Sequence, residues 1–275
     1  MLTEVTLTLG VLTAVAGAVA GGLGAMLGIG GGVFLVPALV QGLGVPMPQA
    51  VAVSLTTVIA TSNMVSAEGN PEAINMRLGL VIELATVVGG LTGSLISAYV
   101  PARHLMLLFS GVLITMAVLT FARRDHRNNL PASADVGGWG GRFVDARTGQ
   151  LVAYRVRRLP LAVGVSFVAG NLATMLGIGG GVVKVPVLNG WCGLPMRVAA
   201  ATSAFMIGLT ATSGALIYFG RGVMLPALAA SAVVGVRLGS PIGLRVGQRQ
   251  PPRRLKMALA IVLLVAAGLM LRRLP

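Results

Sequence analysis

Long apolar segments alternate with short polar connections along almost the whole chain. They lie at about residues 6–27, 33–45, 48–67, 78–100 and 104–122, and then at 159–176, 182–192, 197–219, 223–244 and 255–271. A bilayer-spanning helix needs about 20 apolar residues, and most of these segments approach that length. The pattern predicts an all-α polytopic membrane protein. We expect the first segment to be a retained helix, because the residues before it lack the basic start of a signal peptide.

The second segment of each half is too short to span a bilayer. As helices, 33–45 and 182–192 would reach only about 20 Å and about 16 Å at a rise of about 1.5 Å per residue. The hydrocarbon core is roughly 30 Å thick. Each short segment follows a run of glycines. We therefore expect, in each half, a half-helix after a glycine-broken first helix, near the membrane midplane.

The glycine run is copied once in each half of the chain. Residues 26–37 read Met-Leu-Gly-Ile-Gly-Gly-Gly-Val-Phe-Leu-Val-Pro, and residues 175–186 read Met-Leu-Gly-Ile-Gly-Gly-Gly-Val-Val-Lys-Val-Pro. Ten of the twelve positions are identical at a constant offset of 149 residues. We divide the chain into a first transmembrane repeat, 1–122, a basic loop, 123–158, and a second transmembrane repeat, 159–275. Because each repeat has an odd number of segments, five, the two must insert in opposite directions, which predicts an inverted repeat.

The basic residues gather in a few connections. The net charge is +14 with 21 Lys and Arg, although only 10% of the residues are charged. With 123–158 placed in the cytoplasm, loops 68–77, 123–158, 193–197 and 245–256 hold fifteen of the 21, and the opposite side holds four. This bias follows the positive-inside rule, and such clusters suit anionic lipid heads. No nucleic-acid partner is expected, because no aromatic side chains interleave with the basic ones.

The basic loop carries the pattern of a small β-hairpin. Arg142-Phe-Val-Asp-Ala and Leu151-Val-Ala-Tyr-Arg-Val flank the turn sequence Arg147-Thr-Gly-Gln. We interpret the loop as an exposed connection that carries orientation charges. A regulatory module is the alternative.

Residues for catalysis or metal binding are scarce. Cys192 is the only cysteine, and His104 and His126 are far apart in sequence without ligand-type neighbours. The chain has no Ser/His/Asp or Cys/His set, no carboxylate pair on one apolar face and no Walker-type phosphate loop. We expect neither an enzyme nor a cofactor. Without a nucleotide site, a transporter with this sequence would be driven by ion coupling or by the substrate's own gradient.

The glycine runs are the candidate substrate site. Glycine adopts φ > 0 and brings bare backbone close to a ligand, and irregular backbone at membrane depth is tolerated where it lines a cavity. The half-helix after each run points N–H groups and a positive dipole end at the break, which suits an anion. Close helix packing is the alternative, and it fits the pairs Gly17/Gly21 and Gly89/Gly93 better. The candidate substrate-binding glycines are Gly28, Gly30, Gly31, Gly32, Gly177, Gly179, Gly180 and Gly181.

Three charged residues lie well inside apolar segments, where a charge indicates function. Lys184 is on the first turn of the second half-helix, where the first repeat has Leu35, and it is the candidate countercharge for an anion. Snorkelling to the interface is its alternative. Arg237 is a further candidate for substrate contact, unless it pairs with Glu83 or lies at the cytoplasmic end of its helix. Glu83 is the candidate for carrying a coupling proton, with an interfacial carboxylate as the alternative.

Hydroxyl and amide groups complete the candidate site. Hydroxyls bond oxyanion oxygens well, although most Ser and Thr in membrane helices bond their own backbone. We select the hydroxyls near the starts of the third segments and the amide before the second glycine run. These substrate-binding candidates are Ser54, Thr57, Thr202, Ser203 and Asn171.

The doubled Gly-Ile-Gly-Gly-Gly-x-x-x-Val-Pro motif, followed by Gly-Val-Pro-Met and Gly-Leu-Pro-Met, resembles the sulfite exporter TauE/SafE family. This family is also called the toluene sulfonate uptake permeases. Ala50-Val-Ala-Val-Ser-Leu and Ala199-Ala-Ala-Thr-Ser-Ala are further family-like stretches. The resemblance covers both halves and omits mainly the 123–158 insertion, which is longer than expected for the family. It implies transport of sulfite, sulfoacetate or another organosulfonate across the bacterial inner (plasma) membrane, with proton coupling.

The residues and the resemblance together predict a secondary transporter that works by alternating access on a small anionic substrate. An anion channel is one alternative. A membrane scaffold or accessory subunit without a substrate of its own is another. A homo-oligomer is compatible with the sequence.

Overall fold

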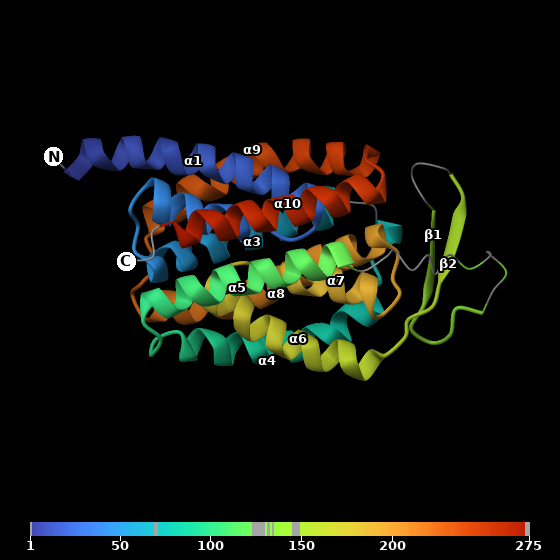
Figure 1. The fold of residues 1–275 in the computed structure, drawn as a ribbon. Coiled ribbons are helices and arrows are strands. Elements are labelled where there is room, and N and C mark those ends of the chain that lie inside the picture. Colours follow the sequence, from blue (N-terminus) through green and yellow to red (C-terminus); the bar gives the residue numbers. More distant parts are fainter. Residues whose placement is uncertain are drawn as a thin grey trace.

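The computed structural model describes residues 2–68, 71–122, 130, 133, 135–144 and 149–272. In this part of the chain the helices lie side by side, and a small hairpin projects from one end of the bundle (Figure 1). The first half forms α1 (Leu2–Leu27), α2 (Gly32–Pro37) with a π-helical turn (Ala38–Gly42), α3 (Met47–Glu68), a 3-10 turn (Pro71–Ala73), α4 (Met76–Ile96) and α5 (Ala102–Ala122). The second half forms α6 (Leu159–Leu176), α7 (Gly181–Gly190), α8 (Met196–Gly220), α9 (Pro226–Arg249) and α10 (Pro252–Leu271).

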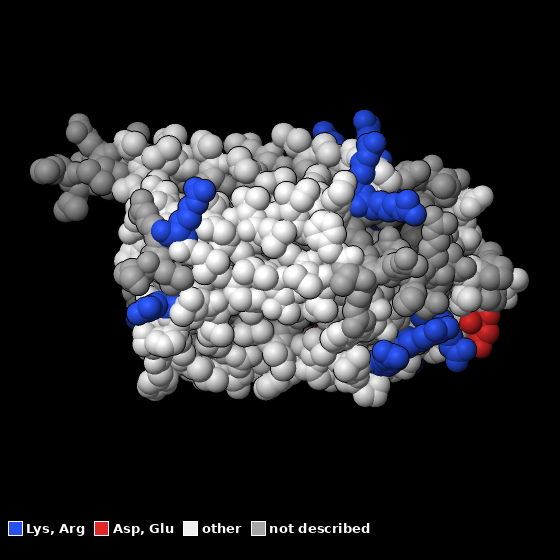
Figure 2. Space-filling view, viewed as in Figure 1, with Lys and Arg blue, Asp and Glu red and all other residues white. Residues whose placement is uncertain are grey.

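Eight helices of the described residues are long and apolar enough to cross a membrane. The segments at Gly32–Gly42 and Gly181–Gly190 are the short ones. Large apolar side chains such as Leu84, Leu216 and Leu238 are more than 60% exposed on the outside of the bundle. The face in Figure 2 shows a broad band without charged side chains between two ends that carry Lys and Arg. The predicted set of long spanning segments and one short segment per half is therefore confirmed.

Two predicted segment boundaries are wrong. The helix within the apolar run 78–100 ends at Ile96, because the backbone turns over residues 97–99 to reach α5. The run 223–244 begins its helix only at Pro226, a residue suited to the first helical turn, and the helix continues to Arg249. The helix of α9 therefore continues past the apolar run into the polar residues that follow it.

The long helices pack in pairs, and two of these pairs, α1 with α9 and α4 with α6, meet through glycines. α1 lies along α9, α6 along α4, α3 along α8 and α5 along α10. A Cβ added at Gly17 would lie 2.4 Å from the Ala232 carbonyl oxygen, and one added at Gly89 would lie 2.0 Å from that of Phe167. The packing role that the sequence assigned to Gly17/Gly21 and Gly89/Gly93 is therefore confirmed.

The predicted hairpin is present in the basic loop. β1 (Gly141–Val144) pairs with β2 (Leu151–Tyr154) in antiparallel register, with Gly141 opposite Tyr154. Phe143 and Tyr154 are buried in the same apolar cluster as Leu78 and Ile82 of α4. Burial also raises the pKa of Tyr154, so its phenol stays protonated at neutral pH. The interpretation of the loop as an exposed connection is thus wrong for the hairpin, because its apolar face packs against the helices.

One side chain, Asn75, joins the hairpin to the bundle. Its Nδ2 donates to the Trp139 carbonyl at 2.9 Å and to the Tyr154 hydroxyl at 3.1 Å. Its Oδ1 accepts from Leu78 N at the start of α4, and its backbone N donates to the Thr202 hydroxyl of α8. The hairpin, α4 and α8 therefore meet at Asn75.

Candidate functional site

The two glycine runs lie directly against each other. A Cβ added at Gly32 would lie 2.0 Å from the Gly177 carbonyl oxygen. A Cβ added at Gly181 would lie 2.9 Å from the Gly28 carbonyl oxygen. At the offset of 149 residues, Gly28 corresponds to Gly177 and Gly32 to Gly181, so the two contacts are reciprocal. No side chain fits between the runs, and glycine is needed for this approach.

The backbone of both runs turns through left-handed conformations. Gly28 and Gly177 have φ of 70°, and Gly30 and Gly179 have φ of 77° and 75°. α1 and α6 end at these turns, as the broken-helix prediction requires. The residue before each half-helix differs, because Gly180 has φ of 62° whereas Gly31 has φ of −72°. The second half-helix therefore begins after a position that favours glycine, and the first does not.

Lys184 forms a buried ion pair beside the second break. It lies on the first turn of α7, and its Nζ is 2.6 Å from Oε2 of Glu83 in α4. Oγ1 of Thr210 in α8 donates to the other carboxylate oxygen at 2.5 Å and lies 3.4 Å from Nζ of Lys184. The side chains of Lys184 and Glu83 are 1% and 4% exposed. We call Lys184, Glu83 and Thr210 the ion-pair cluster.

The ion-pair cluster places two charges inside the bundle, where burying a charge costs free energy. Removing one partner of a buried ion pair leaves an uncompensated charge and costs about 3–5 kcal/mol. The Cε of Lys184 lies 3.8 Å from the position a Cβ would take at Gly180, so the ammonium stem runs along the glycine break. An anion at the break would meet a lysine that is already held by a carboxylate. Exchange between these two partners is the chemistry that the arrangement permits.

The pairing corrects three sequence interpretations. Lys184 and Glu83 do not reach the surface of the bundle, because they are buried and pair with each other. Arg237 does not pair with Glu83. Its side chain is 67% exposed, and Nη1 lies 3.7 Å from Oε1 of Glu68 and against the sulfur of Met64. Arg237 therefore lies away from the ion-pair cluster, toward the end of α3.

Most of the candidate hydroxyls and the amide have partners within the protein. Ser54 donates to the Gly177 carbonyl at 2.6 Å and Thr57 to the Ser54 carbonyl at 2.7 Å, and Thr202 accepts from Asn75 N. Ser54 thus braces the second glycine run. Asn171 donates to Thr92 at 3.1 Å between α6 and α4. Ser203, the counterpart of Ser54, is buried and its Oγ has no hydrogen-bond partner among the described residues.

A cavity opens beside the first glycine run at the hairpin end of the bundle. Its volume is about 390 Å³, and we call it the vestibule. Gly28 and Ala200 line it together with Phe143 and Val144 of β1. Its polar lining residues are Glu68, Arg197 and Gln248. Sequence reasoning missed Arg197, which counts among the orientation charges of a short loop, and Thr210, one of many Thr in membrane helices.

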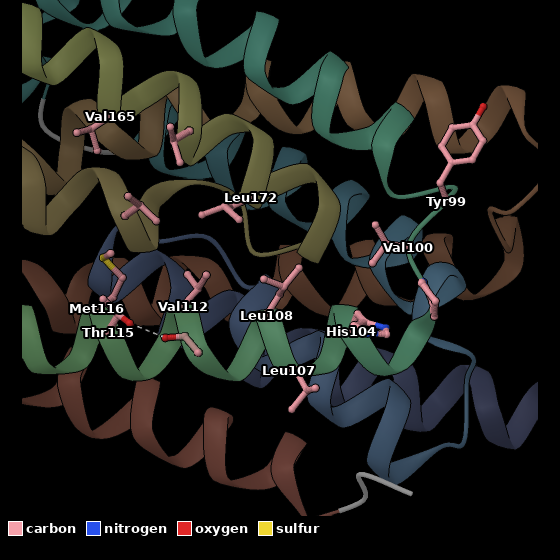
Figure 3. Close-up of a pocket in the computed structure, with 14 residues that line it drawn as sticks. Tyr99, Val100, His104, Leu107, Leu108, Val112, Thr115, Met116, Val165 and Leu172 are labelled. Atoms are coloured by element: carbon pink, nitrogen blue, oxygen red, sulfur yellow. Dashed lines mark hydrogen bonds between the residues drawn. The ribbon is translucent and has the colours of Figure 1, made fainter.

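A second cavity is an apolar groove of about 840 Å³ between α5 and α6. Figure 3 shows aliphatic side chains along its length, with Tyr99, Val100 and His104 toward one end. Its floor includes Val183, the neighbour of Lys184. Apart from His104 it offers an anion no charged partner, so we do not assign the substrate to it.

The described residues hold no group of three His, Cys, Asp or Glu side chains suited to a metal ion. The thiol of Cys192, in the loop after α7, is buried, and burial raises its pKa to about 11. A protonated, buried thiol is a poor nucleophile.

The sequence is similar to those of membrane transporters. Residues 13–270 match the family model described as sulfite exporter TauE/SafE. The chain is 26% identical to the probable membrane transporter protein YunE of Bacillus subtilis (strain 168), over 93% of this chain and 94% of that protein. It is 25% identical to a probable membrane transporter protein of Methanocaldococcus jannaschii, over 94% of both. It is 33% identical to the sulfite exporter TauE/SafE family protein 6 of Arabidopsis thaliana, over 44% of this chain and 28% of that protein. No solved structure matches the chain.

Proposed function

The chain belongs to the sulfite exporter TauE/SafE family of multi-pass membrane transporters and is not an enzyme, and we propose that it is a proton-coupled secondary transporter of a small sulfur-containing anion. Sulfite, sulfoacetate and other organosulfonates are the proposed substrates. The observation that carries the proposal is the buried Lys184–Glu83 pair beside the second glycine break. It supplies a cation for the anion and a carboxylate for the proton at one place.

The proposed coupling step is an exchange of partners at Lys184. A proton that binds the Glu83 carboxylate removes its negative charge, and the Lys184 ammonium then requires another anion. The substrate at the glycine break supplies that charge, held also by the N-terminal end of α7. When Glu83 releases the proton, it recaptures Lys184 and the anion is expelled. Anion and proton are therefore carried together in the same direction.

The proposed conformational change is a rocking of two inverted repeats. The exchange of packing partners supports it: α1 lies along α9, and its counterpart α6 lies along α4. The reciprocal contacts of Gly32 with Gly177 and of Gly181 with Gly28 support it further. Two halves related in this way meet at the glycine runs, so a relative rotation would expose the break to either side in turn.

We place the hairpin end of the bundle on the cytoplasmic side of a bacterial inner membrane. The loops assigned to this side by charge counting do lie together, because Glu68, Val144, Arg197 and Gln248 line one vestibule. α1 begins and α10 ends at the opposite end of the bundle (Figure 1). The positive-inside rule then gives the orientation.

Uptake into liposomes tests the proposal. Purified protein in vesicles with an imposed pH gradient is expected to accumulate radiolabelled sulfite or sulfoacetate above the external concentration. Lys184→Ala is expected to abolish uptake. Glu83→Gln, which resembles the protonated carboxyl, is expected to keep substrate exchange and to lose accumulation driven by the pH gradient. Arg103→Gln, a charge change at an exposed position of α5 that belongs to neither the ion-pair cluster nor the cavity lined by Arg197, serves as the control and is expected to behave as wild type.

Other outcomes would point to the rivals. Flux that never exceeds equilibrium would indicate an anion channel. Vesicles that move no anion would favour a scaffold or accessory subunit.

A further inference from the structure

We propose that the vestibule is the access site of the transported anion, that Arg197 binds the charged group there, and that β1 of the hairpin closes its apolar wall around an organic body. This inference rests on the proposed transport function and adds a preference to it. The access site would favour a small organic anion over a bare inorganic oxyanion. Four observations support it: the fixed cation, the lining, the depth of the cavity and the attachment of the hairpin.

The cation is fixed at the start of a long helix. Arg197 lies on the first turn of α8, and its Nη2 donates to the backbone carbonyls of Gln248 at 3.0 Å and Gln250 at 3.4 Å. These bonds hold the guanidinium at the vestibule, and its fork-like geometry matches oxyanion groups. The positive dipole end of α8 adds to its charge. Glu68, the acidic residue of the lining, has Arg237 at 3.7 Å, so its charge has a counterion of its own.

The remaining lining suits an organic body. Apart from Glu68, Arg197 and Gln248, the wall is made of glycine and apolar side chains, among them Met26, Val65 and Phe143. A volume of about 390 Å³ lies within the range of small-molecule sites, roughly 300–1,000 Å³, and far above the roughly 30 Å³ share of one water. A bare oxyanion would leave most of this apolar wall in contact with water. An anion with a short hydrocarbon or aromatic part would cover it.

The vestibule ends at the substrate site proposed above. Gly28 and Ala200 line it, and a Cβ added at Gly28 would lie 2.7 Å from the Cβ of Ala200. The Gly28 carbonyl in turn faces Gly181, the first residue of α7 and three positions before Lys184. The two glycine runs therefore connect the wall of the vestibule to the helix that carries Lys184.

The hairpin wall is connected to the helices of the ion-pair cluster. Phe143 and Val144 line the vestibule, and Phe143 packs edge-on against Tyr154 with ring centroids 6.3 Å apart. Asn75 ties this hairpin to the start of α4, which carries Glu83, and to Thr202 of α8, which carries Thr210. The hairpin thus supplies part of the proposed binding site and is attached to α4 and α8, which carry Glu83 and Thr210.

The experiment measures binding and uptake of sulfite, ethanesulfonate and benzenesulfonate by the full chain. We expect wild type to bind the two sulfonates at least tenfold more tightly than sulfite. Arg197→Gln is expected to raise KM for all three anions about tenfold with little change in kcat, whereas Lys184→Ala abolishes turnover. Val144→Trp, at a position that is 37% exposed and so tolerant of substitution, is expected to weaken benzenesulfonate binding and to leave sulfite unchanged.

Two matched controls keep the test specific. Leu151 is the register partner of Val144 on β2 and is 47% exposed, but it does not line the vestibule, so Leu151→Trp is expected to have no effect. Arg245→Gln is the control for Arg197→Gln, because it removes an exposed charge near the vestibule, at the end of α9 that carries Gln248. Sulfite bound as tightly as the sulfonates, or Arg197 and Val144 variants equal to their controls, would overturn the inference while proton-driven uptake still stood. Failure of wild type to move any anion would overturn the proposed function and this inference together.

Discussion

The two glycine breaks share a backbone and differ in chemistry. Each ends a long helix in left-handed glycines, starts a short helix and presses against the other break. At the position of Lys184 the first break has Leu35, which is fully buried. Gly89 and Gly93 of α4 contact Phe167 and Asn171 of α6. Gly239 and Gly243 of α9 contact Ala18 and Gly22 of α1 in the same way. Aligning α4 with α9 by these contacts makes Val233 the counterpart of Glu83. The two breaks therefore share the backbone of the proposed hinge, whereas the charges lie at the second break only, with Lys184 from the second repeat and Glu83 from the first.

The contact between the two breaks requires glycines in both repeats, whereas the binding site requires a cation in only one of them. The proposed moving contact between two halves needs small residues on both sides, because a Cβ at Gly32 or at Gly181 would collide with backbone of the facing run. A binding site for one anion needs one cation. A second buried cation would repel the first and add a second desolvation penalty. Substitutions at equivalent positions of the two repeats should thus have equal effects at the glycines of the two runs and unequal effects at the residues of the ion-pair cluster.

The largest effect is expected at the hinge glycines. Gly32→Ala and Gly181→Ala each place a Cβ against backbone of the facing run, at 2.0 Å from Gly177 O and 2.7 Å from the Ile29 Cα. Backbone on both sides prevents relief by a side-chain rotation, so both variants should lose folded protein, measured as monodisperse yield and melting temperature in detergent.

Gly111→Ala is the control, because nothing lies within 4 Å of its added Cβ. It should be neutral or stabilising by up to about 1 kcal/mol. A stable Gly32→Ala beside an unfolded Gly181→Ala would mean that the two runs are not equivalent hinges.

The next effect is expected at the ion pair. Lys184→Leu and Glu83→Val, taken singly, should each destabilise the protein by about 3–5 kcal/mol, because the remaining charge stays buried. The double variant replaces each charged residue by its counterpart in the other repeat, Leu35 for Lys184 and Val233 for Glu83, and it should recover most of that loss while transporting nothing. Reversible unfolding and liposome uptake of the four proteins of this cycle provide the check. A double variant as unstable as the sum of the singles would show that the two side chains are not coupled.

The sequence predicts the hinge much better than the ion pair, for a physical reason. Hydropathy over 20 residues and a repeated glycine run are local patterns, and they specify the ten segments, their breaks and the hairpin. The Lys184–Glu83 pair joins residues 101 positions apart, and its geometry depends on how α4 and α7 pack across α8. One local signal was available. Two opposite charges in apolar segments would each be costly alone, which favours pairing them.

The vestibule was harder still to predict. It is assembled from the helix ends and the hairpin, with Glu68, Phe143, Arg197 and Gln248 drawn from α3, β1, α8 and α9, and Gly28 from the turn after α1. Apart from Gly28 of the glycine run, none of these residues is unusual in its own segment. The positive-inside count identified Arg197 only as a charge on one side of the membrane. Site chemistry that arises from distant segments has no local pattern from which to read it.

A smaller effect is expected at the threonines of α3 and α8. Thr210 donates to the buried carboxylate of Glu83, whereas its counterpart Thr61 donates to the Thr57 carbonyl of its own helix. Thr210→Val should cost about 1.5–3 kcal/mol, the range for hydrogen bonds to charged groups, and should slow uptake. Thr61→Val should cost less than about 0.5 kcal/mol, since the carbonyl keeps its helical donor. Equal losses in the two variants would argue against a special role for Thr210.

The smallest effect, and the sharpest use of the comparison, is expected at the paired serines. Ser54 bonds the Gly177 carbonyl at 2.6 Å, so Ser54→Ala should lower stability by about 1 kcal/mol and leave anion affinity nearly unchanged. Ser203 is equally buried, but its hydroxyl has no hydrogen-bond partner among the described residues. Ser203→Ala should therefore leave the melting temperature unchanged without substrate. If the free hydroxyl serves the anion, the same change should raise Kd roughly fivefold, the equivalent of one hydrogen bond of about 1 kcal/mol. Thermal unfolding with and without a saturating sulfonate separates the two roles. A loss of stability without ligand would make Ser203 a second brace like Ser54, and the asymmetry would then be confined to the charges.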